Sequence, residues 1–201
     1  MTNVLGDIEA MRPEQTTHVA SVLAAAFGDD PIFAWCIPDP SLRLAVLPRF
    51  FELAVRSVAD ADEIEVLTDG LGAALWVPPL RPTVLDEDMD AFAGEIGALI
   101  GDGVERTFAL MEMLDAIHPT EPHRFLWFLG VAPSAQGFGR GAALLRSMLR
   151  VCDRDGVPAG LDATSPANRR LYERHGFRVV GEHSVADSPT MWSMWRPAMT
   201  Q

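Results

Sequence analysis

Three glycines occupy alternate positions, Gly137, Gly139 and Gly141, between the hydrophobic run RFLWFLGV at 124–131 and an apolar-periodic segment at 141–155. The run is typical of a buried strand and the segment of a helix. In a strand-to-helix turn, the first helical N–H groups lack an intrahelical acceptor and carry the positive end of the helix dipole. Glycines there let a phosphate approach the backbone without a Cβ in the way. The turn therefore predicts a site for a pyrophosphate-bearing cofactor.

Two classes of cofactor fit this turn. Read as Gly137-x-Gly139-x-x-Ala142, it is a variant of the dinucleotide fingerprint, and Asp162 stands where a ribose-binding acid belongs. A doubly wound dinucleotide domain, however, needs several further strand-helix units, whereas the segments that follow end in two closely spaced strands. In either case Arg140 could reach a second phosphate oxygen.

The longer string around the turn resembles a known superfamily. Val131-x-Pro133-x-x-Gln136-Gly137-x-Gly139-x-Gly141-Ala142 is similar to the GNAT N-acetyltransferases, whose Q/R-x-x-G-x-G/A motif is matched by Gln136, Gly139 and Gly141. SPANRRLYERHGF at 165–177 resembles their next signature, in which an Asn and a Tyr flank the thiol end of the cofactor. The chain is most similar to the puromycin N-acetyltransferases, through EPHRFL, GVAPSAQGFGRGAA, GVPAGLDATSPAN and LYERHGFRV. Trp127 and Phe128 depart from that pattern, because smaller side chains are expected there.

The resemblance implies an α/β fold with a GNAT-like mixed, splayed β-sheet flanked by helices. Acetyl-CoA would enter between two splayed parallel strands, and its pantetheine arm would pair with the edge of strand 125–131. We expect a bulge at Gly130 to open the sheet, although this glycine could equally leave room for a neighbouring side chain. The expected cofactor contacts are Leu129, Gly130, Val131, Gln136, Gly137, Phe138, Gly139, Arg140, Gly141, Ala142 and Asn168.

An amine that attacks a thioester needs a neutral nucleophile, a donor to the oxyanion and a proton for the thiolate. A backbone N–H near Val131 could be the oxyanion donor. Tyr172, four residues after Asn168 and on the same helix face, is the candidate proton donor. A phenol is a weaker acid than a thiol by about 1.5 pKa units, so we expect a hydrogen bond with partial proton transfer. The alternative is a core tyrosine with its hydroxyl bonded to backbone.

Asp162 is the candidate general base, on the strand that would face the splayed edge. It could equally cap the next helix or bind a backbone amide. Further acidic candidates for binding a cationic amine are Asp29, Asp30 and Glu121, each of which could also be a plain loop carboxylate or a helix cap. Two other candidates for the acceptor side are His123, just before the cofactor strand, and Trp35, in the aromatic segment 31–40 that we expect to be a loop; core packing is the alternative for Trp35.

The elements that position these residues follow from periodicity and turn signals. We expect a helix at 12–27, a helix with Ser41 as its N-cap, and a hairpin of strands 63–68 and 72–78 around Asp69-Gly70. Two helices divided by Gly101–Gly103 should follow within 85–117. The last part alternates strands 124–131, 157–164, 177–185 and 190–195 with helices 141–155 and 166–176. The first pair of these strands should be parallel and the last pair antiparallel.

Composition restricts the partners. A formal net charge of −12 argues against a nucleic acid partner. Cys36 and Cys152 suit neither a disulfide framework nor a metal site, so we expect free thiols in a reducing cytoplasm and no metal. The N-terminus lacks a signal-peptide pattern, and no uncharged apolar run suggests a membrane partner. We expect one domain over 1–201, with a homodimer as a candidate assembly through an exposed strand 191–195.

Together these observations predict an enzyme that moves acetyl from acetyl-CoA, its cosubstrate, to a primary amine of a small molecule. The transfer would occur by direct attack in a ternary complex, and the amine could be an antibiotic such as puromycin. The alternatives are an acyl-CoA-binding module without transfer activity, which would not need Tyr172, and a dinucleotide-binding oxidoreductase.

Overall fold

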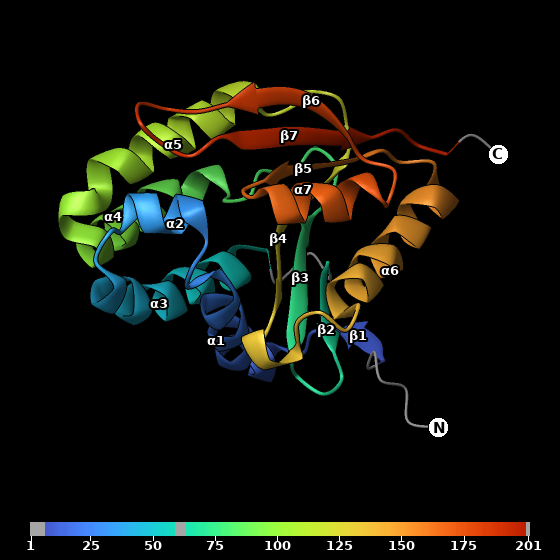
Figure 1. Cartoon of the computed structure of the whole chain (residues 1–201), viewed down its shortest axis with the longest axis horizontal. Coiled ribbons are helices and arrows are strands. Elements are labelled where there is room, and N and C mark those ends of the chain that lie inside the picture. The colour runs from blue at the N-terminus through green and yellow to red at the C-terminus, as the bar shows by residue number, and fades with distance from the viewer. Residues whose placement is uncertain (1–6, 59–62, 200–201) are drawn as a thin grey trace.

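The computed structural model describes residues 7–58 and 63–199. Its centre is a mixed seven-stranded sheet of order β1-β2-β3-β4-β5-β7-β6, shown in Figure 1. The strands are β1 (Ile8–Ala10), β2 (Ile64–Leu67), β3 (Gly72–Val77), β4 (Arg124–Val131), β5 (Ala159–Ala163), β6 (Arg178–His183) and β7 (Met191–Arg196). The α-helices are α1 (Thr16–Phe27), α2 (Pro31–Cys36), α3 (Pro40–Val58), α4 (Met89–Ile100), α5 (Val104–Ile117), α6 (Arg140–Asp155) and α7 (Pro166–Glu173).

Strands β1 to β4 form an antiparallel meander, β4 and β5 are parallel, and β7 lies antiparallel between β5 and β6. The predicted hairpin, the parallel pair and the antiparallel final pair are therefore confirmed. Gly70 has a φ of +74°, the left-handed conformation that the β2–β3 turn requires. Sequence patterns missed β1, because three residues are too few to show a period of two.

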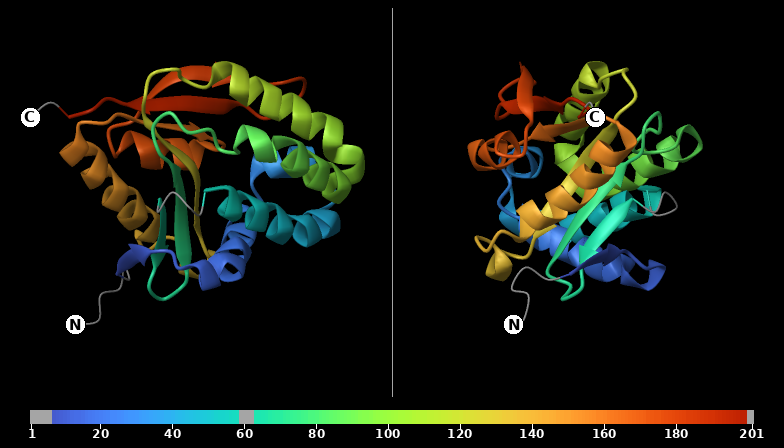
Figure 2. Two further views of the ribbon diagram at one scale, coloured as in Figure 1. Left: turned by 180° about the vertical axis from the view of Figure 1, so that it is seen from behind. Right: turned by 90° about the vertical axis from the view of Figure 1, so that its right-hand side faces the viewer.

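Helices cover both faces of the sheet. Helices α1 and α3 pack on one face of β3, and α6 packs on the other, so that β3 is buried along its whole length. Helix α7 lies on the same face as α6, against β5. Helix α5 lies beside β6 and β7, as Figure 2 shows from two directions, and shares a hydrophobic cluster with Met191 of β7. None of the described helices is both long and apolar enough to span a bilayer.

Three predictions about local structure were wrong. The segment 31–36 is a helix rather than a loop, since the Asp30 carboxylate accepts the Ile32 N–H at 2.9 Å and Pro31 suits a first turn. Helix α3 begins one residue before Ser41, and its cap is Asp39, whose carboxylate accepts the Ser41 N–H at 2.7 Å. Strand β7 is interior, so β6 and not segment 191–195 forms that edge of the sheet.

Candidate functional site

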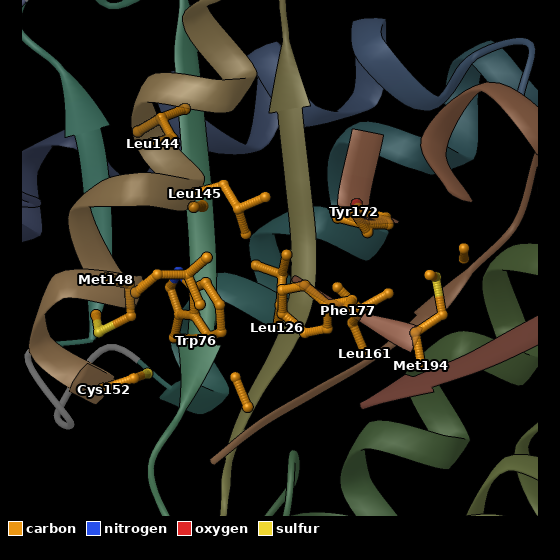
Figure 3. Close-up of a cluster of buried hydrophobic side chains, with 14 of the residues drawn as sticks. Trp76, Leu126, Leu144, Leu145, Met148, Cys152, Leu161, Tyr172, Phe177 and Met194 are labelled. Carbon is orange, nitrogen blue, oxygen red and sulfur yellow. The ribbon is translucent and has the colours of Figure 1, made fainter. Parts of the chain in front are cut away.

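The two parallel strands at the centre of the sheet separate. Strand β4 pairs with β5 only from Arg124 to Leu126, and the last paired residue of β5 is Leu161. Strand β4 continues to Val131 while remaining paired with β3. In Figure 3 the two strands diverge beyond Leu126 and Leu161, and Tyr172 lies on the side where they part. The sheet is therefore splayed between β4 and β5, as the sequence predicted.

The irregularity in β4 lies at Trp127 and not at Gly130. Phe128 faces Leu75 and Leu126 faces Trp76, so Trp127 is the extra residue of a bulge. Gly130 keeps regular register with Ala73. A Cβ on Gly130 would lie 2.8 Å from the Leu23 Cδ2 atom, so this glycine makes room for helix α1. The predicted bulge at Gly130 was wrong, and the alternative interpretation, close packing, is correct.

Two backbone units of β4 are directed toward the splayed side. The Ala132 N–H donates to the Leu71 carbonyl at 2.8 Å, which fixes the alternation of hydrogen bonds between β3 and β4. By that alternation Gly130 and Phe128 are bonded to β3, whereas the N–H groups of Leu129 and Val131 are directed away from it. An extended ligand along this edge of β4 would therefore meet these two N–H groups and the Leu129 carbonyl.

The glycine turn has the conformation of an open N-terminal end of a helix. Gly137 and Gly139 have φ values of +83° and +79°, and Gly139 is the N-cap of α6. The first helical bond is made by the Ala143 N–H to the Gly139 carbonyl at 3.0 Å, which leaves the preceding N–H groups without an intrahelical acceptor. A Cβ on Gly137 would meet no atom within 4 Å, so packing alone does not require a glycine there. The turn fits an anionic group held by backbone N–H donors.

The side chains of the turn have different roles. The Gln136 amide donates to the Val131 carbonyl at 3.0 Å and ties the turn to the end of β4. Arg140, predicted to reach a phosphate, forms an ion pair with Asp69 in the β2–β3 turn. Burial would raise the pKa of Asp69, but hydrogen bonds from Arg140 and the Leu71 N–H outweigh it and lower the pKa. Phe138 is 62% exposed, while Gly141 lets α6 approach Leu129 of β4.

Tyr172 and Asn168 both lie on helix α7, as predicted. Tyr172 is buried, in edge contact with Phe177 at a centroid distance of 6.0 Å. Burial, followed by the nearby charge of Asp30, raises the pKa of the phenol above its ordinary value. Within the described residues its hydroxyl has no hydrogen-bond partner, so the predicted alternative of a hydroxyl bonded to backbone does not hold. Asn168 is partly exposed, and its N–H donates to the Ser165 hydroxyl that caps the helix.

Asp162 lies one residue beyond Leu161, the last residue of β5 that pairs with β4, and is itself paired with Ser193 of β7. Leu161 and Ala163 face the same hydrophobic cluster as Tyr172, so Asp162 faces the opposite side of the sheet. One carboxylate oxygen accepts the Ser193 hydroxyl at 2.7 Å, and burial raises the pKa of the group. It does not cap the next helix, since Ser165 does. The structure thus places the predicted proton donor and the predicted base on opposite faces of the separating strands.

Sequence reasoning underestimated Asp30. Besides capping α2, its buried carboxylate accepts the Thr164 hydroxyl at 2.5 Å, just beyond the end of β5, and its charge acts on Tyr172. Burial raises its pKa, while these hydrogen bonds oppose that effect. The motif D-D-P signals a helix cap, but Thr164 is 134 residues away in sequence, so no local pattern could have revealed the contact.

The other candidates are dispersed. Trp35 lies on α2, where its indole N–H donates to Asp187 at 3.0 Å and the Arg106 guanidinium lies over its ring. His123 is buried against Gly160 and Trp195, on the Asp162 side of the sheet. Asp29 and Glu121 are exposed. Cys36 and Cys152 are both free and buried, as predicted.

Residues 51–177, more than half of the chain, match the Acetyltransferase (GNAT) family. The chain belongs to the GNAT acetyltransferase family. An uncharacterized N-acetyltransferase of Schizosaccharomyces pombe is 25% identical over 175 residues, which are 79% of this chain and 68% of that protein. The family assignment replaces the dinucleotide interpretation that the glycine spacing left open.

Solved structures agree with this GNAT assignment. A Corynebacterium glutamicum protein described as histone acetyltransferase HPA2 and related acetyltransferase is 28% identical, with a TM-score of 0.70 over 96% of this chain and 97% of that one. Drosophila melanogaster polyamine N-acetyltransferase shares the fold with a TM-score of 0.61 and 15% identity, over 95% and 99% of the two chains. The GNAT family generally uses acetyl-CoA, and the open glycine turn and the free edge of β4 fit that molecule.

Proposed function

We propose that this GNAT protein transfers acetyl from acetyl-CoA to a primary amine of a small molecule, by direct attack in a ternary complex. The observation that carries the proposal is the separation of β4 from β5 after Leu126 and Leu161, with Tyr172 on one face and Asp162 on the other. Donor and acceptor can then approach the same point from opposite faces of the sheet. No covalent enzyme intermediate is required.

Binding of the cofactor would rest on backbone groups. When bound, acetyl-CoA supplies the activated thioester. N–H groups from Gly137 to Ala142 would hold its diphosphate at the positive end of α6. The N–H groups of Leu129 and Val131 would pair with the pantetheine arm, and backbone N–H groups beside the bulge at Trp127 are further donors for the oxyanion.

Tyr172 would act as a hydrogen-bond donor to the departing sulfur. Because burial raises its pKa, the phenol is an even weaker acid relative to a thiol than its ordinary value suggests. Full proton transfer is correspondingly unfavourable, and the hydroxyl stays protonated across the working pH range. The proton that the thiolate needs would therefore come from the amine nitrogen, while the Tyr172 hydroxyl stabilises the negative charge on the sulfur.

Asp162 is a better candidate than Asp30 for the general base. Both oxygens of Asp30 already accept hydrogen bonds, from the Ile32 and Phe33 N–H groups and from Thr164. Asp162 accepts one, from Ser193, and its second oxygen has no partner within the described residues. A raised pKa also makes Asp162 a stronger base than an ordinary aspartate. Asp30 would instead hold α2 against the end of β5 and attract a cationic amine.

The acceptor is a small-molecule amine in this proposal. Aromatic side chains line the region between α2 and the bulge, where Trp35 and Trp127 belong to one hydrophobic cluster, and Asp30 adds negative charge at its edge. These features suit an amine with an apolar or aromatic body. Puromycin is one such amine, and the resemblance of the sequence motifs makes it the first compound to test.

The test is an acetyl-CoA consumption assay with a panel that contains puromycin, an arylalkylamine, a polyamine, agmatine and an amino acid. We expect turnover with at least one amine, and Tyr172→Phe should lower kcat roughly ten- to a hundredfold while the KM for acetyl-CoA stays close to the wild-type value. Binding of acetyl-CoA without turnover on a broad amine panel would favour the binding module instead. Full activity of Tyr172→Phe would remove Tyr172 from the mechanism.

A further inference from the structure

A narrow pocket lies behind Asp162, on the face of the sheet that α5 covers. Its walls include Asp162 and Ser193 together with His118 and Phe125, and it has room for about one water molecule. His118 follows the end of α5 and is itself exposed. The pocket therefore joins the candidate base to a titratable side chain at the protein surface.

A second imidazole lies beside that of His118. His123 is 5% exposed, and its ring centroid lies 5.1 Å from that of His118. Its Nδ1 atom lies 2.7 Å from the Glu121 carbonyl, which can only accept a hydrogen bond, so in the neutral ring the lone pair is on Nε2. Nε2 is buried without a hydrogen-bond partner within the described residues. A buried basic nitrogen is normally hydrogen-bonded, so we expect Nε2 either to accept a hydrogen bond from a water or to be protonated.

The orientation of His123 brings Nε2 to the Asp162 face of β5. A Cβ on Gly160 would lie 3.1 Å from Nε2, and Gly160 and Asp162 are two residues apart, hence on the same face. Gly160 also lines the pocket. The charges of His123 and His183 act on Asp162, while His118 responds to His123 and to Asp115 of α5. These are the ionisable groups whose charges act on Asp162 and His118.

We propose that Asp162, one water in this pocket, and the imidazoles of His118 and His123 form a path that carries the proton lost by the ammonium form of the substrate to solvent. The inference rests on the proposed acetyl transfer. The Asp162 carboxylate takes one proton from the ammonium nitrogen, and the water passes it to Nε2 of His123. The same proton then returns through the water to His118 and leaves to bulk solvent. A second amine proton ends on the sulfur of CoA, so each turnover releases one proton.

The first test needs no turnover. Histidine titrations are followed by NMR in the wild-type chain and in Asp162→Asn, with the exposed His18 as the internal control. Removing the negative charge should lower the pKa of His118 or His123 by about half a unit or more and leave His18 unchanged. Titration curves of both histidines that coincide in the two proteins would overturn the proposal, whatever reaction the protein catalyses.

The second test uses an amine that the wild-type enzyme acetylates. His118→Gln and His123→Gln should each lower kcat about tenfold in dilute buffer, and added imidazole should restore most of the loss by carrying the proton instead. His18→Gln is the matched control and should keep wild-type kinetics. A loss that imidazole does not restore would show that the histidines only support the structure. If the wild-type chain acetylates no amine, the proposed function fails, and the NMR result still decides whether the path is connected.

Discussion

At the scale of residues, the site contains two groups whose burial sets their chemistry. Tyr172 and Asp162 both have raised pKa values, because burial disfavours the charged form of each. For the phenol the consequence is a permanent hydrogen-bond donor. For the carboxylate it is a stronger base whose ionised form is costly to keep in the folded protein. Such a cost is tolerated where function requires it.

The cost of ionising Asp162 predicts a gain in stability on neutralising it. Its folded pKa lies above the unfolded value, so the group destabilises the fold at pH 7 and has no effect below about pH 3, where it is protonated in both states. Asp162→Asn can still accept the Ser193 hydrogen bond and should raise the Tm at pH 7, by about 2–4 °C for each kcal/mol recovered. Thermal denaturation from about pH 3 to pH 8 measures the difference, which should vanish at the acidic end.

Asp155→Asn is the control for that measurement. The hydrogen bond from Arg154 lowers the pKa of Asp155, so neutralising this carboxylate should not raise the Tm at pH 7. A lower Tm for Asp162→Asn at pH 7 would contradict the assignment of Asp162 as a destabilised carboxylate.

At the scale of elements, helix α6 has glycines in left-handed conformation close to both ends. Gly137 has a φ of +83° in the turn before it, and Gly156 has a φ of +66° at its C-cap. A Cβ at either position would meet no atom within 4 Å. Substitution should therefore strain the backbone similarly at both positions. Only Gly137, however, lies in the turn that we expect to hold the diphosphate of acetyl-CoA.

Gly137→Ala and Gly156→Ala should each cost about 1–2 kcal/mol of stability, since a Cβ disfavours the left-handed conformation. Only Gly137→Ala should also weaken binding of acetyl-CoA, about tenfold or more, because the turn must reorient its N–H donors. Calorimetric titration with CoA alongside denaturant unfolding separates the two effects. Equal CoA affinity in both variants would mean that the turn does not hold the diphosphate.

At the scale of the whole molecule, the sheet consists of two groups of strands that meet only where β4 pairs with β5. Strands β1 to β4 form one packed half, β5 to β7 form the other, and the two halves are joined along only the first three residues of β4. A ligand inserted where they separate would contact both halves and add interactions that the unfolded chain lacks.

Acetyl-CoA should therefore raise the Tm of the full chain, whereas NAD should not. At a concentration of about a hundred times Kd, ligand linkage adds about 2.7 kcal/mol, which corresponds to roughly 5–10 °C for a chain of this size. A thermal shift series against ligand concentration tests this, and a larger shift with NAD than with CoA would contradict the assignment of the cofactor.

The sequence by itself determined the strand, the glycine turn and the helix that follow one another from Arg124 to Asp155, because their signals are local in the chain. Only the tertiary structure decided where β4 bulges, that Asp30 meets Thr164, and that His118 lines the pocket of Asp162 with His123 beside it. Those outcomes depend on how helices α1, α2 and α5 pack on the sheet. Packing of that kind brings together residues far apart in sequence, and no periodicity within either segment records which side chains will meet.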